Sequence, residues 1–471
     1  MTGLPKGWTE ATIDELAQTS LGKMLDAKQQ TGANPTPYLR NINVRWGKFD
    51  LSDVAEMDIA PHELERVLAT VGDVIACEGG EPGRAAVWRG SPIAIQKALH
   101  RIRPLDGVSP DYLAFALRAQ ASTRQLDRLF TGTTIKHLPQ EKLRKMVVPL
   151  APGPEQERIV VAVEEAFSKL NAGEAGLRTV RQLLKRMREA VLSAAITGRL
   201  VPQDPTDTPA AQLLGDFGIE PLNDPSLPTL PAAWSWTQVQ DIGQVDLGRQ
   251  RSPKYHSGHN MKPYLRVANV FEDRIDTSDV MEMHFEPEAF ERSRLALGDI
   301  LLNEGQTPEL LGRPAMYRGE PPEVAFTNSL LRFRAGRGIE PEWALLVFRH
   351  HMHSGRFTRE SRITTNIAHL SAARFKPVEF PVPPIEEQCR VVEEFDRLSS
   401  FIEACERAVD AGLARSSALR RSVLKAAFEG RLVPQDPSDE PASVLLSRMH
   451  SSRAEAVSPE RRRTPRVRSS P

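Results

Sequence analysis

The stretch Gly-Arg-Leu-Val-Pro-Gln-Asp-Pro occupies residues 198–205, and the same eight residues return at 430–437. An identity of this length at two distant points of one chain is not expected by chance, so it indicates an internal duplication. The period is much longer than that of a solenoid repeat. The pattern therefore predicts a duplicated pair of domains.

Shorter matches extend the repeat over most of the chain and keep the same order in both copies. They are Pro5-x-x-Trp8 with Pro231-x-x-Trp234, Tyr38-Leu39-Arg40 with Tyr264-Leu265-Arg266, Gly72-Asp73 with Gly298-Asp299, and His137-Leu138 with His369-Leu370. The spacing between partners changes slightly along the chain, which places small insertions in surface loops. We therefore expect two similar domains related by a pseudo-two-fold axis.

Each globular segment consists of short apolar runs separated by Gly, Pro and Asn. This texture is typical of strands and short helices in an α+β domain. The run Gly-Gly-Glu-Pro-Gly-Arg at residues 79–84 is interpreted as a flexible turn before a strand, and residues 305–313 are its partner. Such a turn either changes the chain direction or brings backbone close to a ligand.

A long helix is predicted to follow each globular segment. Pro154 and Pro384 each precede acidic residues that suit the first turn of a helix, and Gly198 and Gly430 end the two helices. A helix of this length would span roughly 65 Å at about 1.5 Å per residue. Apolar residues recur with the three-and-four spacing of a coiled-coil seam. The predicted seam contains Val163, Leu170, Leu177, Leu184, Met187, Val191, Phe395, Ile402, Val409, Leu419 and Val423.

The two seams are expected to bury each other, because either helix alone would expose an apolar stripe to water. A duplication related by a two-fold axis predicts that the helices run antiparallel. The alternative is that each helix packs only on its own globular domain.

These patterns divide the chain into two α/β-type domains and the segments that connect them. The predicted segments are 1–151 (first globular domain), 152–201 (first helical region), 202–230 (linker), 231–382 (second globular domain), 383–433 (second helical region) and 434–471 (a tail expected to be disordered towards its end). An Arg-, Ser- and Pro-rich composition is the reason for the last expectation.

Composition limits the classes of function. The 61 Lys and Arg residues balance the 61 Asp and Glu residues, so the whole chain projects no strong field towards nucleic acid or membrane. Any DNA-binding face must come from local clustering. The three scattered cysteines suit a reducing cytosol, and no apolar run or leader indicates a membrane or secreted protein. We expect a cytoplasmic protein.

No catalytic or metal-binding pattern stands out. Residues 34–38, Asn-Pro-Thr-Pro-Tyr, resemble the Asn-Pro-Pro-Tyr signature of amino-group DNA methyltransferases, but an extra Thr splits the prolines, so the segment is interpreted as a loop. No phosphate-binding loop of the P-loop type occurs. His350, His351 and His353 lack a second ligand group at zinc-site spacing and are interpreted as a surface cluster. The chain is therefore expected to be non-catalytic and to hold no metal.

Taken together, these features resemble the specificity subunit of type I restriction-modification systems. The resemblance rests on the two globular halves, on Pro-Pro-Ile-Glu-Glu-Gln at 383–388 with its counterpart from Pro152, on the repeated helix endings, and on Thr-Thr-Ile-x-His-Leu at 133–138 with Thr-Asn-Ile-x-His-Leu at 365–370. It implies two target-recognition domains that each read one half of a bipartite, asymmetric DNA site. It also implies that the helices act as spacer and docking site.

The resemblance further implies the partners: double-stranded DNA, two methyltransferase subunits and, through the complex, motor and nuclease subunits. S-adenosylmethionine, ATP and Mg²⁺ are expected in those partner subunits, with no cofactor in this chain. The alternative is a coiled-coil scaffold whose domains read no DNA. A fused restriction-methylation enzyme is disfavoured, because the chain leaves no room for a cofactor domain.

Arg and Asn side chains are the best candidates for DNA contacts, because they match phosphates and base edges. In the first domain the candidates are Arg40, Asn41, Asn43, Arg45, Arg84 and Lys136; in the second they are Arg266, Asn269, Arg313, Asn328 and Asn366. The alternative for each residue is a strand-end cap or a surface charge.

Overall fold

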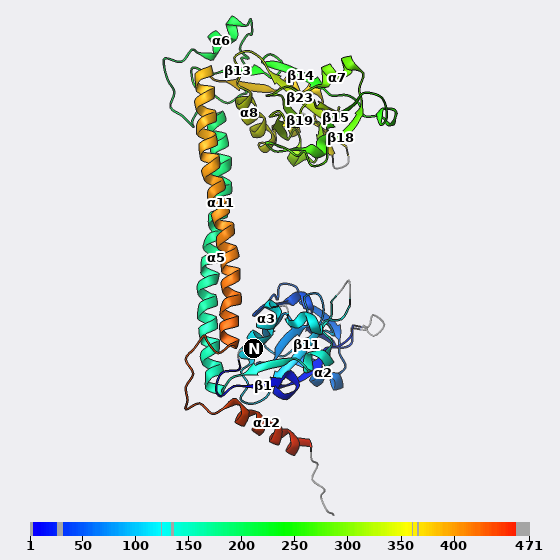
Figure 1. Cartoon of the computed structure of the whole chain (residues 1–471), viewed down its shortest axis with the longest axis vertical. Coiled ribbons are helices and arrows are strands. Elements are labelled where there is room, and N and C mark those ends of the chain that lie inside the picture. Colours follow the sequence, from blue (N-terminus) through cyan, green and yellow to red (C-terminus); the bar gives the residue numbers. More distant parts are fainter. Residues whose placement is uncertain are drawn as a thin grey trace, which may run out of the picture. The chain divides into compact units, whose positions relative to one another are not determined.

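The computed structural model in Figure 1 describes residues 3–25, 32–123, 125–132, 136–359, 361–364 and 367–457. The chain divides into two compact units, unit 1 with Met1–Arg178 and Asp410–Pro471, and unit 2 with Thr179–Val409. Neither unit is simply one copy of the repeat. Each contains one globular domain, the first part of the long helix that follows it, and the last part of the long helix of the other copy.

The domain of unit 1 is built on two four-stranded sheets. One has the order β2 (Ala17–Leu21), β11 (Leu99–Pro104), β8 (Val74–Cys77), β9 (Ala85–Val87), and the other β6 (Ala55–Asp58), β3 (Pro35–Leu39), β10 (Ile93–Ile95), β7 (Leu68–Ala69). The ribbon β1 (Thr9–Thr12) with β12 (Val147–Leu150), the hairpin β4 (Val44–Arg45) with β5 (Lys48–Phe49), and helices α1 (Ile13–Leu16), α2 (Pro61–Val67), α3 (Pro110–Ser122) and α4 (Gln140–Arg144) complete the domain.

The domain of unit 2 repeats this plan. Its main sheet has the order β14 (Gly243–Leu247), β23 (Leu330–Ala335), β19 (Ile300–Asn303), β21 (Pro314–Met316), and its second sheet β18 (Met281–His284), β15 (Met261–Leu265), β22 (Ala325–Phe326). The other elements are β13 (Ser235–Gln238) with β26 (Glu379–Val382), β16 (Val270–Phe271) with β17 (Arg274–Ile275), the sheet of β20 (Gly305–Gln306), β25 (Ile367–His369) and β24 (Arg362–Thr364), and helices α7 (Pro287–Ser293), α8 (Pro341–His353), α9 (Arg356–Arg359) and α10 (Ala372–Phe375). The predicted pair of similar α/β-type domains is confirmed.

One equivalent hydrogen bond shows how closely the two cores correspond. In unit 1 the buried Tyr112 of α3 donates its hydroxyl to the carbonyl of Pro149 at 2.7 Å, and in unit 2 the buried Trp343 of α8 donates its indole N–H to the carbonyl of Pro381 at 3.0 Å. Large aromatic side chains need such a partner for their polar atom when they are buried. The helix-to-strand contact is therefore retained, although the side chain differs.

The two long helices, α5 (Gly153–Ile196) and α11 (Ile385–Phe428), lie against each other in an antiparallel direction within each unit (Figure 1). In unit 1, Glu174 accepts hydrogen bonds from Ser416 at 2.7 Å and from Arg420 at 3.0 Å. In unit 2, Arg188 and Glu406 form an ion pair at 2.9 Å. The predicted pairing is confirmed, and the alternative, in which each helix packs only on its own domain, is wrong.

The predicted seam is correct at most positions and wrong at two. Val163, Leu184, Val191, Phe395, Ile402 and Val409 are buried, and Leu170, Leu177 and Val423 are partly buried. Met187 and Leu419 are exposed, because the helix turns them away from their neighbours in the unit. Buried apolar residues of the two helices outside the predicted seam include Phe167, Leu192, Val391 and Leu424.

The repeated octapeptide packs in each unit against the Pro-x-x-Trp motif, whose tryptophan is bonded to the start of a long helix. In unit 1, Gly430 adopts a positive φ against Pro5, and Trp8 donates its indole N–H to Glu155 at 3.0 Å. In unit 2, Gly198 lies against Pro231, and Trp234 donates to Glu387 at 2.9 Å. A Cβ on either glycine would overlap the proline ring. This close contact gives a physical reason for an identical sequence at both places.

Ion pairs hold the segments that follow the octapeptides. Asp439 pairs with Arg158 at 2.6 Å in unit 1, and Asp207 pairs with Arg390 in unit 2. Each segment then forms a helix, α6 (Ala210–Asp216) in the expected linker and α12 (Ala442–Val457) in the expected tail. The first part of the expected tail is therefore ordered, since Leu445 and Met449 of α12 are buried in the core of unit 1. Residues 458–471 lie outside the described part.

Two local expectations are also corrected. The segment Asn-Pro-Thr-Pro-Tyr is not a loop: residues Pro35–Leu39 form β3, which pairs with β6 on one side and with β10 on the other. The histidines of α8 are not all at the surface. His351 is buried against the carbonyl of Glu379 at 3.0 Å, and burial lowers its pKa to about 4.

Candidate nucleic-acid interface

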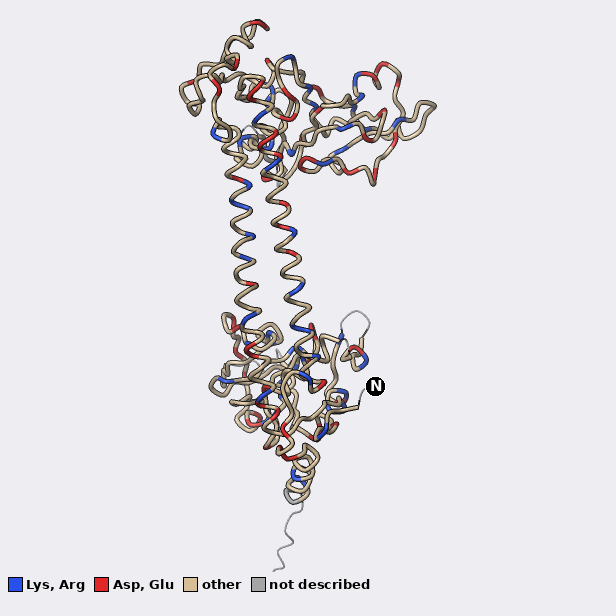
Figure 2. Tube along the Cα trace, turned by 60° about the vertical axis from the view of Figure 1, so that its left-hand side comes forward, with Lys and Arg blue, Asp and Glu red and all other residues tan. Residues whose placement is uncertain are grey.

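Figure 2 shows Lys and Arg as well as Asp and Glu along both long helices and in both domains. The two signs are not evenly mixed, since residues 175–188 of α5 hold five Lys and Arg and no Asp or Glu. A surface for a polyanion must therefore be sought in particular side chains and in the partners that neutralise them.

Asn43 and Asn269 were predicted to contact DNA, and the structure gives both another role. Each is 2 % exposed, and each amide oxygen accepts the backbone N–H of the arginine three residues earlier, at 2.8 and 3.0 Å. Each amide nitrogen donates to two backbone carbonyls of the loop that follows. Because all of these groups are occupied, the prediction is wrong for this pair. They brace equivalent loops.

Arg40 and Arg266 begin these braced loops and point to the surface. Arg40 pairs with Asp53 at 2.7 Å, and Arg266 pairs with Asp279 at 2.5 Å. Both aspartates are more than two-thirds exposed, so these pairs are open to solvent and of small energy. DNA can compete with such aspartates for the guanidinium groups, because the fork of donors fits a phosphate equally well.

The glycine turn of unit 1 gathers two further candidates. Arg84 donates to the carbonyl of Asn41 and to the carboxylate of Glu81, both at 2.8 Å. The positive φ of Gly80 allows the turn to approach the side chain of Asn41, since a Cβ there would lie 3.1 Å from its amide nitrogen. The turn thus fixes Asn41 and Arg84 side by side. Arg45 lies on the hairpin beside them, about half exposed and 3.6 Å from Asp50.

Lys136 lies next to the His-Leu motif at the end of the domain. It is exposed, 3.9 Å from Asp127 and over the ring of Phe130. The neighbouring His137 contacts Glu78 at 3.3 Å, and the equivalent His369 contacts Glu304 at 3.4 Å. The histidine of the motif therefore ties the end of each domain to the turn after its central strand.

In unit 2 the remaining predicted DNA-contact residues have different surroundings. Arg313 is half-buried over the ring of Phe271 at 4.8 Å, and burial lowers its pKa. Asn328 is exposed, and its backbone N–H donates to the carbonyl of Arg249 at 3.1 Å. The prediction for Asn366 falls outside the described residues.

The sequence prediction missed a basic run in unit 2. Residues 247–271 contain Arg249, Arg251, Lys254, Lys262 and Arg266 and no Asp or Glu. Total charge and domain charge concealed this run, because acidic residues on either side balance it. A count of charge in a short moving window would have found it.

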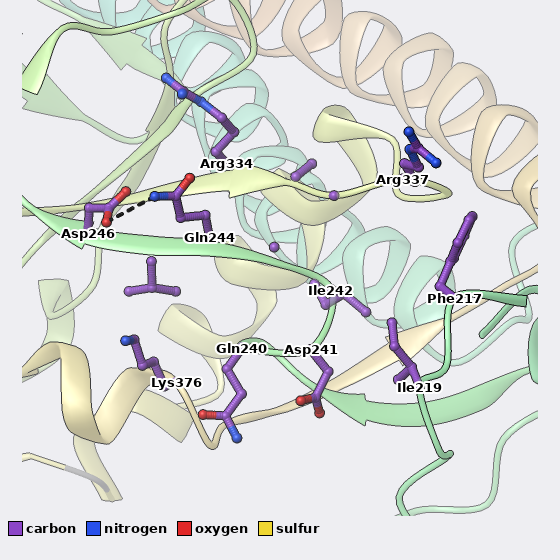
Figure 3. Close-up of a pocket in the computed structure, with 14 residues that line it drawn as sticks. Phe217, Ile219, Gln240, Asp241, Ile242, Gln244, Asp246, Arg334, Arg337 and Lys376 are labelled. Carbon is purple, nitrogen blue, oxygen red and sulfur yellow. Dashed lines mark hydrogen bonds between the residues drawn. The ribbon is translucent and has the colours of Figure 1, made fainter. Parts of the chain in front are cut away.

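A cavity of about 840 Å³ lies beside β14 and β23 in unit 2 (Figure 3). Phe217 and Ile219 form one side, and Gln244 donates to Asp246 at 3.3 Å on the other. Its Arg334 is held by Asp299 at 2.6 Å. None of the lining residues is a Ser, Thr, Cys or His. The cavity therefore contains no nucleophile–histidine pair.

The described residues offer neither a metal-binding cluster nor a membrane-spanning helix. No cluster of three or more His, Cys, Asp or Glu side chains there could hold a metal ion. No described helix is long and apolar enough to cross a membrane.

Curated proteins similar to this chain share one description. The specificity subunit of type I restriction enzyme EcoKI from Escherichia coli (strain K12) is 21 % identical over 483 residues, with 96 % of each chain covered. The EcoBI specificity subunit from Escherichia coli is 26 % identical over 397 residues, covering 79 % of this chain and 77 % of the relative. No family model matches the chain.

Solved structures show the same fold. The HsdS subunit from Thermoanaerobacter tengcongensis has a TM-score of 0.53 and 18 % identity, covering 91 % of this chain and 98 % of that one. A chain from a study of complex assembly and conformational transition of the type I R-M system has a TM-score of 0.64 and 18 % identity, covering 92 % of this chain and 100 % of that one. The resemblance expected from the duplicated motifs is thereby confirmed, and the chain is a relative of the specificity subunits of type I restriction enzymes.

Proposed function

We propose that this chain is the DNA-recognition subunit of a type I restriction-modification complex, and that each unit reads one half of a bipartite, asymmetric DNA site. The observation that carries the proposal is a duplicated fold with unlike exposed side chains. The shared braces, Asn43 and Asn269, hold equivalent loops, while other equivalent positions differ between the units, such as Trp46 with Glu272 and Lys23 with Arg249. A reader built twice from one plan with different surfaces should read two different half-sites.

In this proposal the residues that contact DNA are the members of the predicted set that are not buried. Arg45, Lys136 and Asn328 are exposed, and Arg40, Asn41, Arg84, Arg266 and Arg313 are partly buried. Asn366 remains a prediction from sequence. The pairs of Arg40 with Asp53 and of Arg266 with Asp279 support the choice, since the tip of each partly buried arginine reaches an exposed carboxylate.

We further propose that the chain is not itself an enzyme. Adenine methylation and DNA cleavage would then be carried out by partner subunits, which bind S-adenosylmethionine, ATP and Mg²⁺. The paired helices would be the docking site for two methyltransferase subunits and the spacer between the two readers. A cytoplasmic location follows from this role.

Selection of randomised duplex DNA by the purified complex of this chain with its methyltransferase subunits tests the proposal. We expect enrichment of one motif with two unlike halves and a gap of fixed length in which no base is selected. A scaffold that reads no DNA would enrich no motif. That result would remove the proposal.

The spacer role has its own test. One heptad inserted into both long helices keeps the apolar face in register and adds about 10 Å to each helix. We expect the unread gap to lengthen by about three base pairs while both half-sites stay the same. Exchange of residues 1–150 with those of a relative should change one half-site only. An unchanged gap would contradict the spacer role alone.

A further inference from the structure

Three cations of the basic run in unit 2 have no acidic partner. Lys262 pairs with Glu323 at 3.0 Å and Arg266 with Asp279 at 2.5 Å, so these two are neutralised. Arg249, Arg251 and Lys254 form no ion pair with any carboxylate in the described part of the chain. Unneutralised cations that lie within a few residues of one another are the usual feature of a phosphate-binding surface.

Contacts hold both the backbone and the guanidinium group of Arg249 in place. Its N–H donates to the carbonyl of Phe326 at 3.0 Å, and Gly248 allows this approach, since a Cβ there would lie 2.3 Å from the same oxygen. The guanidinium lies 4.0 Å from the ring centroid of Tyr255 and 5.1 Å from that of Phe285. One terminal nitrogen is buried there without a hydrogen-bond partner. An arginine held between two rings is oriented before any ligand arrives.

The neighbouring cations lie over rings of the same hydrophobic cluster, which contains Tyr264 and Phe285 with Tyr255 packed against it. The ammonium of Lys254 lies 4.8 Å from the centroid of Tyr255, and the guanidinium of Arg251 lies 5.7 Å from that of Tyr264. Lys254 and then Arg249 lower the pKa of Tyr255, in keeping with the position of both cations beside its ring. The exposed Asn328 is bonded to Arg249 through the backbone.

The equivalent position of unit 1 is occupied differently. Gly22 makes the same close approach, with a Cβ there 2.1 Å from the carbonyl of Ile95, but the next residue is Lys23, which is ion-paired with Glu63. The backbone arrangement is therefore common to both units. The unpaired, ring-stacked cation belongs to unit 2.

We propose that Arg249, Arg251 and Lys254 form a clamp for a phosphate group of the DNA backbone, with Arg249 at its centre. The proposal rests on the proposed DNA-reading function and adds a contact that sets affinity and position on the duplex without selecting a base. A phosphate fits better than a base edge, because the three unpaired cations lie within six residues of one another over one aromatic cluster.

The test measures the salt dependence of binding by the methyltransferase complex to its selected DNA. Arg249→Ala should weaken binding about tenfold at moderate salt and lower the slope of log K against log salt by about 1, while the selected motif stays the same. Arg249→Lys should keep the slope but lose part of the affinity, because charge is retained and stacking is not. Lys262→Ala and Lys23→Ala are matched controls, since each removes a cation that already has a carboxylate partner.

The outcomes are distinguishable. An unchanged slope and affinity in Arg249→Ala, in a complex that still selects a motif, would overturn the clamp and leave the proposed function standing. A change in the selected base at one position would show base reading instead and would also overturn it. A wild-type complex that selects no motif would remove the proposed function itself. Circular dichroism of each variant checks that the domain is folded.

Discussion

The two units place an arginine at the same point of the helix that faces the long helices, and they surround it differently. In unit 1, Arg118 lies over the rings of Phe167 at 4.8 Å and Trp46 at 5.7 Å. In unit 2, the equivalent Arg349 lies over Phe395 at 5.4 Å and pairs with Glu272 at 3.0 Å. A ring in one unit therefore takes the place of a carboxylate in the other.

The difference shows which parts of the duplicated fold are fixed by physics and which are free to vary. Burial would raise the pKa of Glu272, but the hydrogen bond from His353 and the charge of Arg349 outweigh it and lower the pKa. In unit 1 burial lowers the pKa of Arg118 instead. The cation on the helix is common to both units, but its partner is not. Unlike surfaces can therefore be built on one common frame.

The largest predicted effect concerns a feature that the units share. Asn43→Ala and Asn269→Ala should each destabilise their own unit by about 3 kcal/mol, because three hydrogen bonds at about 1 kcal/mol each are lost and buried backbone groups lose their partners. Hydrogen exchange, read separately in peptides of each unit, measures this. Equal losses of unfolding free energy are expected. A much smaller loss at one site would show that Asn43 and Asn269 do not stabilise their loops equally.

The next effect is a difference between the units in how their stability depends on pH. Gln120 of α3 and His351 of α8 occupy equivalent positions. The Gln120 amide donates to the carbonyl of Val147 in β12 at 2.6 Å, and the His351 ring lies 3.0 Å from the carbonyl of Glu379 in β26. The pKa of His351 is lowered to about 4 from 6.5, so the unfolded state takes up protons first as the pH falls. Stability of unit 2 should fall between pH 6.5 and 4, by about 2 kcal/mol at pH 5.

His351→Gln copies the arrangement of unit 1 and supplies the control. The variant should remove the acid-sensitive loss in unit 2 and change little at pH 7.5, as followed by the exchange of amide protons in α8 and β26. A pH profile identical to that of the wild type would contradict the assignment to His351.

A smaller effect tests the opening comparison directly. Glu272→Ala should destabilise unit 2 by about 1.5 kcal/mol, because Arg349, with only 12 % of its side chain exposed, loses its nearest carboxylate and keeps Asp273 at 3.7 Å. Trp46→Ala should cost unit 1 about 1 kcal/mol through the lost cation–π contact and packing. Thermal unfolding with a probe in each unit measures both. If Glu272→Ala also destabilised unit 1, the inference that Arg118 and Arg349 are stabilised independently, each within its own unit, would be contradicted.

The smallest effect concerns Glu155 and Glu387, the buried carboxylates that accept the indole N–H of Trp8 and Trp234. Burial raises the pKa of Glu155 and of Glu387, so each contributes a stability that is lost as the pH rises through the raised pKa. Glu155→Gln and Glu387→Gln should remove that decline in their own unit and change stability at neutral pH by under about 1 kcal/mol. Denaturant titrations between pH 4 and 8 measure it. A steeper decline in the variants is the contradicting result.

The sequence predicts the duplicated fold and the pairing of the long helices better than the roles of individual side chains. The octapeptide, helix caps and apolar spacing indicate the duplication and the antiparallel helices, because those signals are local and periodic. The seam fails at Met187 and Leu419, where a heptad pattern drifts against the true helical period. The role of Asn43 depends on carbonyls that only the folded loop brings together. The partners of Arg249 come from three separated segments, and no sequence spacing reveals them.

The most direct test of two unlike readers in one chain is a comparison of the methylated sites in the host genome with and without this gene, while the partner subunits are expressed. We predict the loss of one modified motif, made of two different halves separated by a fixed unread gap. A methylome that does not change, or a lost motif that is one uninterrupted palindrome, would contradict the account.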